Sequence, residues 1–403
     1  MKTKQKTLMV IGAGLFQVPA IETAKSMGLR VLAVDKNPEA PGRPLADFFE
    51  PVSIAEIDRV VDCADKWHKK VGIDGVIMIG TDYSCTPAAV ADRLGLVGVG
   101  PEVALKATDK FEMRKTLVAA GVPCPEFKLA HDLEMALAGA TEIGYPLVIK
   151  PVDSMGGRGV RRVDSNEDLR AAYPATAAFS PTGRVLLENY MPGPELSIDT
   201  IVYNGRVHLL TAADRIIEFE PYFVETGHTI PSILDSDTIR EAFEFMIKGI
   251  EAIGVGIGPS KCDMKITPDG PRIGEITVRL SGGYHCQHTT YLATGMNNVR
   301  AAIDIALGQE PSERDLIPVW HRYAGERALL PGYGRIKSIS GYDEAERIRG
   351  VKKLFCHVKP GDVLKPLTSN MGKAGNVVAC GNTRDEMERA FTETRRTVRF
   401  DLE

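Results

Sequence analysis

A lysine beside a glycine-rich loop is the feature of this sequence most suggestive of chemistry. The stretch from Tyr145 to Arg162 reads YPLVIKPVDSMGGRGVRR; an apolar run ends at Lys150, and residues 160–163 are predicted to form a second strand. The loop between them contains Ser154, Gly156, Gly157 and Gly159. Glycines let backbone N–H groups approach an anion closely, and Lys150 adds a positive charge. No Gly-Lys-Ser/Thr follows, so this is not a Walker loop; we predict a phosphate-binding flap, with a plain glycine hairpin as the alternative.

Two carboxylates stand on neighbouring predicted strands later in the chain. Asp263 lies within residues 259–266 and Glu275 within residues 271–280. Unpaired carboxylates are costly to bury, and two converging ones suit Mg²⁺, which binds carboxylate and phosphate oxygens. Arg279 is two pleats beyond Glu275 and therefore faces the same side, where it can neutralise a phosphoryl group or a carboxylate. The alternative is an ordinary salt bridge between the strands.

The N-terminal residues carry an incomplete dinucleotide-binding pattern. An apolar strand, residues 8–11, is followed by Gly12-Ala13-Gly14, a helix, and a second strand that ends at Asp35. An acid at this place binds the ribose in Rossmann proteins, but the third glycine of the fingerprint is replaced by Gln17. An NAD(P)-dependent oxidoreductase therefore stays open as an alternative, beside a Rossmann-like domain that uses the turn for packing or for another ligand.

Histidines and cysteines give weaker signals. His285, Cys286 and His288 could suggest zinc, but no second ligand pair stands at the spacing of a structural site, so we predict that they line a pocket. The seven cysteines include no CxxC pair, which fits free thiols in a reducing cytoplasm. The basic and then apolar start resembles a signal peptide, but its apolar part is too short and leads into a glycine turn.

Composition limits the classes of partner. The chain has 403 residues, 44% hydrophobic and 25% charged, which predicts a globular protein of two to four domains. The net charge of −4, without a long Lys/Arg run, argues against nucleic acid or an anionic membrane as a partner. Apolar runs are broken well before the ~18 residues of a membrane helix. A cytoplasmic protein is therefore expected.

Alternating patterns predict the elements that position these residues. Strands at 8–11, 31–34, 75–79 and 95–99, separated by helices, predict an open parallel sheet near the N-terminus. A capped helix is expected from Ser165 and a loop over residues 171–183. Asn204-Gly205 predicts a tight hairpin, and residues 237–253 a long amphipathic helix. The last ninety or so residues read as a small β-rich domain ending in a helix.

The order of these features resembles the ATP-grasp superfamily, nearest to carboxylate–amine ligases of the L-amino-acid ligase type. Carbamoyl-phosphate synthetase large chain and biotin carboxylase are more distant resemblances. The ordered set is Lys110, Lys150, the glycine flap, Glu188, Glu195, Asp263, Glu275 and Arg279. The resemblance implies an α/β fold that becomes α+β toward the C-terminus. It places a Rossmann-like domain at residues 1–107, an ATP-grasp domain at 108–310 with a lid at about 124–187, and a C-terminal subdomain at 311–403.

The resemblance also implies a nucleotide site. Lys110 and Lys150 would contact the ATP phosphates, with Lys150 also near the adenine, and the Ser154–Gly159 loop would close over the terminal phosphates. The strand Glu188-Asn189-Tyr190-Met191 would hold the adenine edge, and Glu195 the ribose. Asp263 and Glu275 would bind Mg²⁺, or Mn²⁺ in its place. Thr277 stands where many members have asparagine, which leaves a second metal ion open.

The substrate side is implied in the same way. Arg279 with Ser281, Gly282 and Gly283 would hold the transferred phosphate and the substrate carboxylate. Glu225 and His228 would lie near the acceptor, His228 as a ligand of the acyl phosphate or as a base, with an ordinary loop histidine as the alternative. The catalytic residues would be Arg279, His228 and Lys150. Residues 361–386 would wall the substrate pocket.

The function implied is an ATP-dependent ligase of small molecules. It would phosphorylate a carboxylate to an acyl phosphate and couple it to an amine, releasing ADP and phosphate. The expected partners are the carboxylate and amine substrates, and a homodimer is compatible with this class. ATP-dependent activation of carbamate or bicarbonate is an alternative within the superfamily. A non-catalytic nucleotide-binding regulator is disfavoured by the intact set of charged residues.

Overall fold

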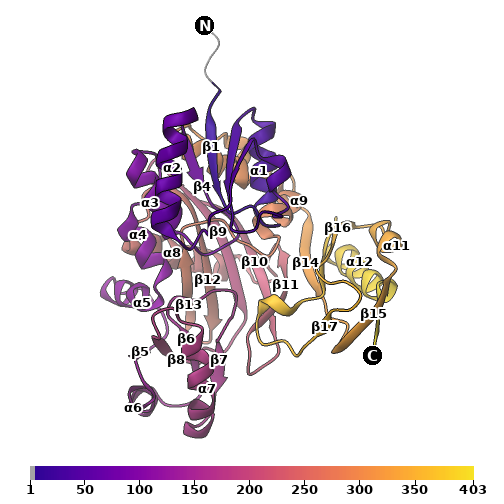
Figure 1. The fold of residues 1–403 in the computed structure, drawn as a ribbon. Helices are drawn as coiled ribbons and strands as arrows, with labels where there is room; N and C mark the ends of the chain where they lie inside the picture. Colours follow the sequence, from indigo (N-terminus) through magenta and orange to yellow (C-terminus); the bar gives the residue numbers. More distant parts are fainter. Residues whose placement is uncertain (1–4) are drawn as a thin grey trace.

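An α/β domain opens the described part of the chain, which comprises residues 5–403 of the computed structural model (Figure 1). Its parallel sheet has the order β3-β2-β1-β4. The strands are β1 (Thr7–Ile11), β2 (Arg30–Val34), β3 (Phe48–Glu50) and β4 (Gly75–Ile77). One face packs against α1 (Val18–Ser26) and α10 (Asn298–Ala306), and the other against α2 (Ile57–Val71) and α3 (Cys85–Leu94). Burial on both faces explains the uninterrupted apolar runs of β1 and β2.

One predicted strand of this domain is wrong. Residues 95–99 pair with no strand in the described chain. Gly95 ends α3 in the left-handed conformation, and the Leu96 N–H bonds back to the Ala91 carbonyl at 2.8 Å. The segment is therefore a helix cap that leads into α4 (Pro101–Thr108), despite its apolar composition.

A smaller antiparallel sheet forms the lobe at the lower left of Figure 1. Its order is β5-β8-β6-β7, and α6 (Leu133–Ile143) and α7 (Asn166–Ala178) pack on it. The strands are β5 (Phe127–Ala130), β6 (Leu147–Pro151), β7 (Arg161–Val163) and β8 (Val185–Asn189). Helix α5 (Lys110–Ala119) precedes the lobe. We call this lobe the lid.

The loop expected over residues 171–183 is instead mostly helical. Helix α7 runs through Pro174 to Ala178. Leu169, Ala172, Tyr173 and Thr176 are buried at the spacing of one helix face, against the sheet of the lid. That packing outweighs the hydrogen bond that Pro174 cannot donate.

An eight-stranded sheet forms the centre of the molecule, in the order β13-β12-β9-β10-β11-β14-β18-β16. Its first strands are β9 (Glu195–Tyr203), β10 (Arg206–Glu218), β11 (Val224–Ile230), β12 (Gly258–Thr267) and β13 (Gly270–Thr277). The predicted hairpin is confirmed, since β9 and β10 join through Asn204 and Gly205, both at positive φ. The predicted long helix is confirmed as α8 (Ser236–Ile253), which packs on β12 and β13.

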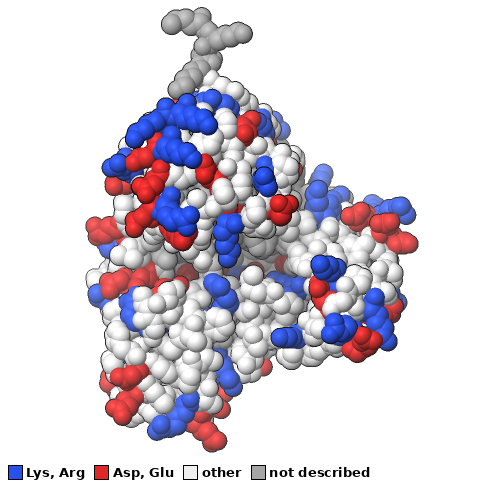
Figure 2. Space-filling model, in the orientation of Figure 1, with Lys and Arg blue, Asp and Glu red and all other residues white. Residues whose placement is uncertain are grey.

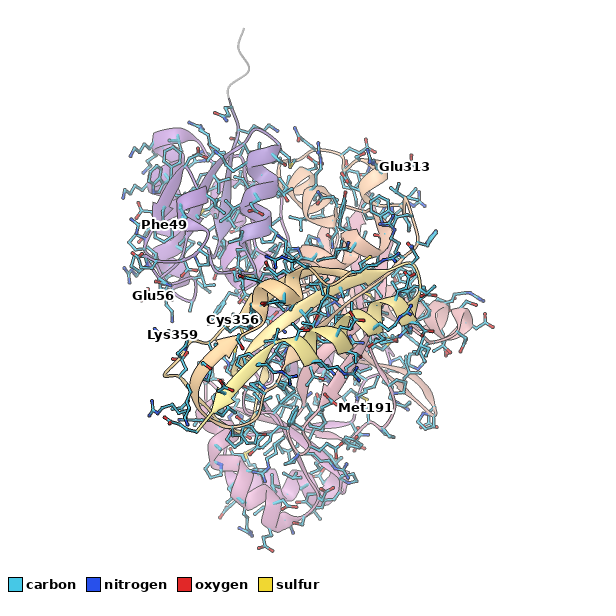
Figure 3. The ribbon with its side chains drawn as sticks, turned by 90° about the vertical axis from the view of Figure 1, so that its right-hand side faces the viewer. Phe49, Glu56, Met191, Glu313, Cys356 and Lys359 are labelled. Carbon is cyan, nitrogen blue, oxygen red and sulfur yellow. The ribbon has the colours of Figure 1, made fainter. Side chains whose placement is uncertain are left out.

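The C-terminal residues continue the same sheet. They add β14 (Tyr323–Leu329), β16 (Val351–Cys356) and β18 (Gly375–Gly381) to it. A second, three-stranded sheet contains β15 (Gly334–Ser340), β17 (Val363–Leu364) and β19 (Arg399–Leu402). Short helices α9 (Thr290–Thr294) and α11 (Tyr342–Glu346) and the longer α12 (Arg384–Thr397) complete this part, which Figure 3 shows in front of the other domains. The chain thus ends in a strand after the expected helix, and none of its described helices is long and apolar enough to cross a membrane.

Candidate active site

A cleft lies where the N-terminal domain, the lid and the eight-stranded sheet meet (Figure 2). It holds about 1030 Å³ of space, its open mouth included. Many residues singled out from the sequence line it: Lys110, Lys150, Ser154, Gly156, Gly157, Glu188, Asn189, Tyr190, Met191, Glu195, Asp263 and Glu275. The chain therefore brings together side chains that are up to 165 positions apart in the sequence, from Lys110 to Glu275.

The glycine loop between β6 and β7 faces this cleft. Gly156 and Gly157 have φ values of 67° and 73°, which favour glycine. Within the described chain, neither N–H donates a hydrogen bond to a protein acceptor. Gly159 also has positive φ but does not line the cleft. It packs closely instead, since a Cβ there would be 3.0 Å from Phe179 and Pro151. The loop therefore offers free N–H groups to the cleft through its first two glycines, while the third serves packing.

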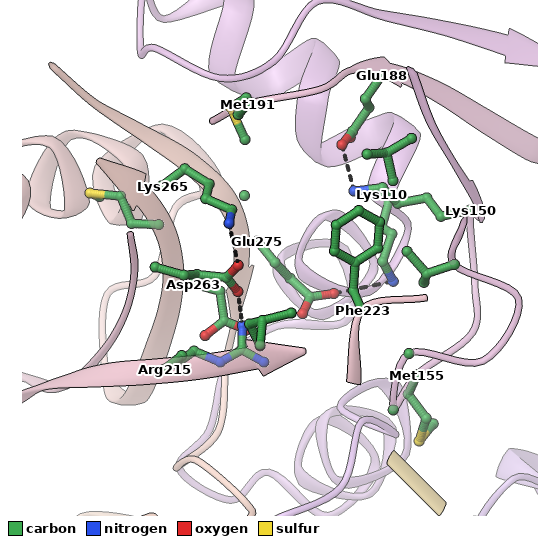
Figure 4. Close-up of a pocket in the computed structure, with 18 of the residues that line it drawn as sticks. Lys110, Lys150, Met155, Glu188, Met191, Arg215, Phe223, Asp263, Lys265 and Glu275 are labelled. Carbon is green, nitrogen blue, oxygen red and sulfur yellow. Dashed lines mark hydrogen bonds and ion pairs between the residues drawn. The ribbon is translucent and has the colours of Figure 1, made fainter. Parts of the chain in front are cut away.

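Two lysines extend into the cleft beside this loop (Figure 4). Lys110 Nζ donates to the Ser154 carbonyl at 2.8 Å and lies 3.1 Å from a Glu275 carboxylate oxygen. Lys150 Nζ lies 2.5 Å from Glu188, whose other oxygen pairs with the buried Arg114 guanidinium at 2.8 Å. Burial lowers the pKa of Lys150, although Glu188 opposes that shift. Both ammonium groups are thus held in place by protein contacts.

The two acids predicted to bind a metal ion face each other across β12 and β13. Asp263 and Glu275 are register partners. Burial opposes ionisation of Glu275, but Lys110, Lys261 and Arg279 outweigh it and hold its pKa well below its usual value. Asp263 Oδ2 lies 3.1 Å from Arg215.

The oxygen atoms at this place fit a hard cation such as Mg²⁺. Asp263 Oδ1 and Thr277 Oγ1 are buried and find no hydrogen-bond partner among residues 5–403. Orphaned buried oxygens are rare in proteins and suit a divalent cation that prefers oxygen ligands. Thr277 lies two residues beyond Glu275 on β13, so both side chains face the same side. These atoms would hold the ion together with Glu275.

The substrate residues predicted after β13 lie at a domain joint, outside the cleft lining. Arg279 Nε donates to Asp82 Oδ1 at 2.6 Å, and Asp82 itself lines the cleft. Ser281 Oγ donates to Asp199 at 2.6 Å. A Cβ on Gly282 would be 3.0 Å from the Gly80 carbonyl, so that glycine permits close packing of the N-terminal domain. Gly283 follows with a φ of 60°.

Glu225 and His228 stand on β11, also outside the cleft lining. Arg215 Nη2 lies 2.9 Å from Glu225 and connects it to the cleft. Burial opposes ionisation of Glu225, but Arg215 and Lys373 outweigh it and hold its pKa well below the usual value. His228 is only 1% exposed, and its Nε2 lies 2.7 Å from the Thr289 hydroxyl. In this conformation His228 is therefore an interior residue.

Glu326 is a buried acid close to His228 that the sequence did not single out. It stands on β14 as the register partner of His228, and the His228 Nδ1 to Glu326 Oε2 distance is 3.8 Å. Burial raises the pKa of Glu326 to about 7, with Lys373 acting in the opposite direction. Asn376 donates to its other oxygen.

The histidines and cysteine considered for zinc serve packing. His285 lies 2.9 Å from the Thr211 hydroxyl, and its ring stacks on His228 with centroids 5.1 Å apart. Cys286 is buried in the core beneath β1 and β2, and His288 stacks on Tyr284. None of the three lines the cleft, and the described residues contain no group of three or more His, Cys, Asp or Glu placed to hold a metal ion.

The glycine turn after β1 leaves little room for a dinucleotide. The N–H of Gly12 donates to the Val34 carbonyl at 2.8 Å and that of Ala13 to Asp35 Oδ2 at 2.9 Å. The Gln17 side chain fills the turn, where a Cβ on Gly12 would approach it at 3.1 Å, and Gln17 Nε2 donates to the Ile79 carbonyl at 2.6 Å. The turn is used for packing, which disfavours the oxidoreductase alternative.

Arg215 is the main site residue that the sequence did not reveal. It pairs with Glu195, Glu225 and Asp263, and so connects the expected ribose, acceptor and metal positions. Figure 4 shows it beside Asp263. The Asn204-Gly205 turn alone would place Arg215 opposite Pro194. A bulge between Leu209 and Thr211 shifts the register so that it meets Glu195. Phe223 and Lys265 also line the cleft without having been singled out, while Met155 lies in the predicted loop and Asn370 in the predicted wall of residues 361–386.

Comparison with protein families gives two matches along the chain. Residues 107–283 match the ATP-grasp domain, and residues 327–403 match L-amino acid ligase C-terminal domain 2. The first range holds the lid and the cleft residues from Lys110 to Glu275; the second holds Asn370, β18 and α12. The y4rH protein of Sinorhizobium fredii is 26% identical over 381 residues, covering 91% of this chain and 77% of that protein.

Comparison with solved structures gives similar folds over the whole chain. The L-amino acid ligase from Bacillus licheniformis superposes with a TM-score of 0.87 at 23% identity, covering 100% of both chains. A biotin carboxylase–ATP complex from Campylobacter jejuni has a TM-score of 0.74 at 20% identity, covering 98% of this chain and 92% of that one. At these identities the two likenesses concern the fold, and they extend over nearly the whole chain.

Proposed function

The chain belongs to the ATP-grasp ligase family, as its motif order suggested, and on that premise we propose that it joins a small carboxylate to an amine at the expense of ATP. The carboxylate, most simply that of an amino acid, takes the terminal phosphoryl group. The amine then displaces phosphate to form an amide, leaving ADP and phosphate. The L-amino acid ligase C-terminal match supports an amino acid as a substrate.

The observation that carries this proposal is the convergence of charge in one cleft. A loop with free glycine N–H groups, two anchored ammonium groups and a facing pair of carboxylates line the same space. We assign the phosphates to Lys110, Lys150 and the loop, the adenine to residues 188–191, and the ribose to Glu195. Positioning and charge neutralisation account for the catalysis proposed here, so no side chain need act as a covalent nucleophile.

The metal position supports phosphoryl transfer rather than redox chemistry. Asp263, Glu275 and Thr277 would hold Mg²⁺, which would neutralise charge on the transferring phosphoryl group. Arg279 would bind the carboxylate being activated, with its guanidinium held by Asp82 at 2.6 Å. Lys150 would remain against the phosphates because its ammonium group is held by the Glu188 carboxylate.

The acceptor side rests on the acids and bases of β11. Glu225 stays ionised beside Arg215 and would bind an ammonium group. His228 would act only after its ring becomes accessible, since it is stacked on His285 here. Two protons must leave an attacking ammonium group during amide formation. The His228–Glu326 pair would take one of them, and the departing phosphate or solvent would take the other.

Product analysis tests the proposal. Paired amino acids and small acids are incubated with Mg-ATP, and the nucleotides are separated by chromatography. We expect ADP and phosphate in step with amide formation, and hydroxylamine should trap the activated acid as a hydroxamate. AMP and pyrophosphate as products would contradict the proposal. ADP release that depends on bicarbonate and on no other acid would point to the bicarbonate-activating alternative.

A further inference from the structure

A tight turn of the C-terminal domain reaches the nucleotide cleft. Residues Asn370–Gly372 form a single helical turn between β17 and β18, and Asn370 lines the cleft. Gly372 permits the turn, because a Cβ there would be 2.6 Å from Leu367. The turn is therefore packed onto its own domain while Asn370 extends toward another.

Asn370 touches two elements of the site at once. Its backbone N–H donates to the Gly156 carbonyl of the phosphate loop at 3.0 Å. Its side-chain Oδ1 accepts from the backbone N–H of Glu225 at 2.8 Å. The phosphate loop and the strand that carries Glu225 are thus joined through one residue of a third segment.

The surrounding contacts show how closely the loop is seated. A Cβ on Gly157 would lie 3.3 Å from the Phe223 carbonyl and 3.9 Å from Asn370 N, so only glycine fits without displacement. Burial opposes ionisation of Glu225, and Lys373, three residues beyond Asn370, acts with Arg215 to hold the pKa of Glu225 well below its usual value. Met371, next to Asn370, is 77% exposed.

We propose that Asn370 is a positioning residue that locks the phosphate loop closed against the strand bearing Glu225. This rests on the proposed function, in which the loop covers the phosphates and Glu225 binds the amine. A closed loop keeps water from the activated acid until the amine attacks. With the loop released, water adds in place of the amine, the acyl–phosphate bond breaks, and free acid and phosphate leave without an amide.

The test compares Asn370→Ala with Met371→Ala in the full-length protein. The first removes the side-chain bond to Glu225 that fixes the Asn370 turn to β11, so the backbone N–H that binds Gly156 stays but its turn is no longer held in place; the second removes an exposed neighbour. For Asn370→Ala we expect roughly threefold to tenfold more ADP per amide formed, the scale of one lost hydrogen bond, and Met371→Ala should match wild type. Unchanged thermal unfolding of both variants would exclude a folding defect.

A second readout needs no turnover. Trypsin cleavage at Arg158, within the loop, is followed with and without a non-hydrolysable Mg-ATP analogue. The analogue should protect wild type and Met371→Ala, and protect Asn370→Ala less. Equal protection together with an equal ADP-to-amide ratio overturns the lock. Lost protection in Asn370→Ala, with no amide or hydroxamate from wild type on any substrate pair, upholds the lock and refutes the proposed reaction.

Discussion

The turn after β1 and the loop after β6 both place glycines at positive φ where an apolar strand ends, but they use their backbones differently. In the first, the N–H groups of Gly12 and Ala13 donate to Val34 and Asp35, and Gln17 fills the space. In the second, the N–H groups of Gly156 and Gly157 have no acceptor in the described chain and face the cleft.

The difference shows that glycine spacing alone does not make a phosphate site. Glycine permits the backbone to approach a ligand, but the N–H groups bind it only if the protein has not already satisfied them. The β1 turn is closed by its own neighbours, and the β6 loop is open beside Lys110 and Lys150. Three experiments test this contrast, in order of expected effect.

Removing the lysine of the open loop should have the largest effect. Lys150→Met takes away the ammonium group proposed to bind the phosphates, while Glu188 keeps its pairing with Arg114. We expect kcat/KM for ATP to fall about 100-fold, as for loss of one preorganised electrostatic group. The matched variant Lys36→Met, beside the closed turn, should retain wild-type kinetics. Equal kinetics for the two variants would contradict the view that the loop after β6, and not the turn after β1, serves the reaction.

Nucleotide should change the exposure of the open loop. Arg158 lies in that loop. Glycine-rich loops that cover a ligand site open and close without unfolding the rest of the protein. We expect trypsin to cut there, and a non-hydrolysable Mg-ATP analogue to slow the cut about tenfold, as a loop held mostly closed requires. The variant Arg158→Gln identifies the fragment. A cleavage rate that is the same with and without nucleotide would count against a mobile phosphate loop.

Reopening the closed turn should not create a dinucleotide site. Gln17→Gly completes the glycine fingerprint but leaves Asp35 bound to Ala13. We expect no NADH binding by fluorescence, and a loss of roughly 1 kcal/mol in the free energy of unfolding as the buried Gln17 bond disappears. Gln17→Met, which keeps volume without the donor, separates the hydrogen bond from the packing. Tight NADH binding by Gln17→Gly would show that the Gln17 side chain alone excludes the cofactor.

Much of the fold, and the convergence of the β6 loop, its lysine and the two acids in one cleft, could be predicted from sequence. The parallel sheet, the hairpin at Asn204-Gly205 and α8 follow from apolar periodicity and turn chemistry, which are local signals. Lys150 and the glycine loop are contiguous, and Asp263 and Glu275 lie on a simple hairpin. These residues could be identified from the sequence because they lie close together along the chain.

The remainder depended on long-range geometry. Arg215 reaches Glu195 only because a bulge shifts the β9–β10 register by one residue. Asn370 lies within the predicted wall of residues 361–386, but its contacts with Gly156 and Glu225 join segments that are far apart in the chain. Packing of one face of α7 against the sheet of the lid keeps the helix intact through Pro174 despite its low helix propensity. Residues 95–99 are apolar like a strand, but they form the C-terminal cap of α3.

Buried Glu326 links protonation to folding in this protein. Its pKa is about 7 in the native chain against an ordinary 4.5, since burial outweighs the opposing Lys373 and the nearby Arg327. Between those values the unfolded chain releases a proton that the native chain retains, so stability falls as the pH rises through that window, by roughly 3 kcal/mol in all. Glu326→Gln cannot ionise and still accepts the Asn376 bond. Urea unfolding should give it wild-type stability at pH 4 and greater stability at pH 8; equal values at pH 8 would mean that water or a neighbouring cation relieves the buried charge.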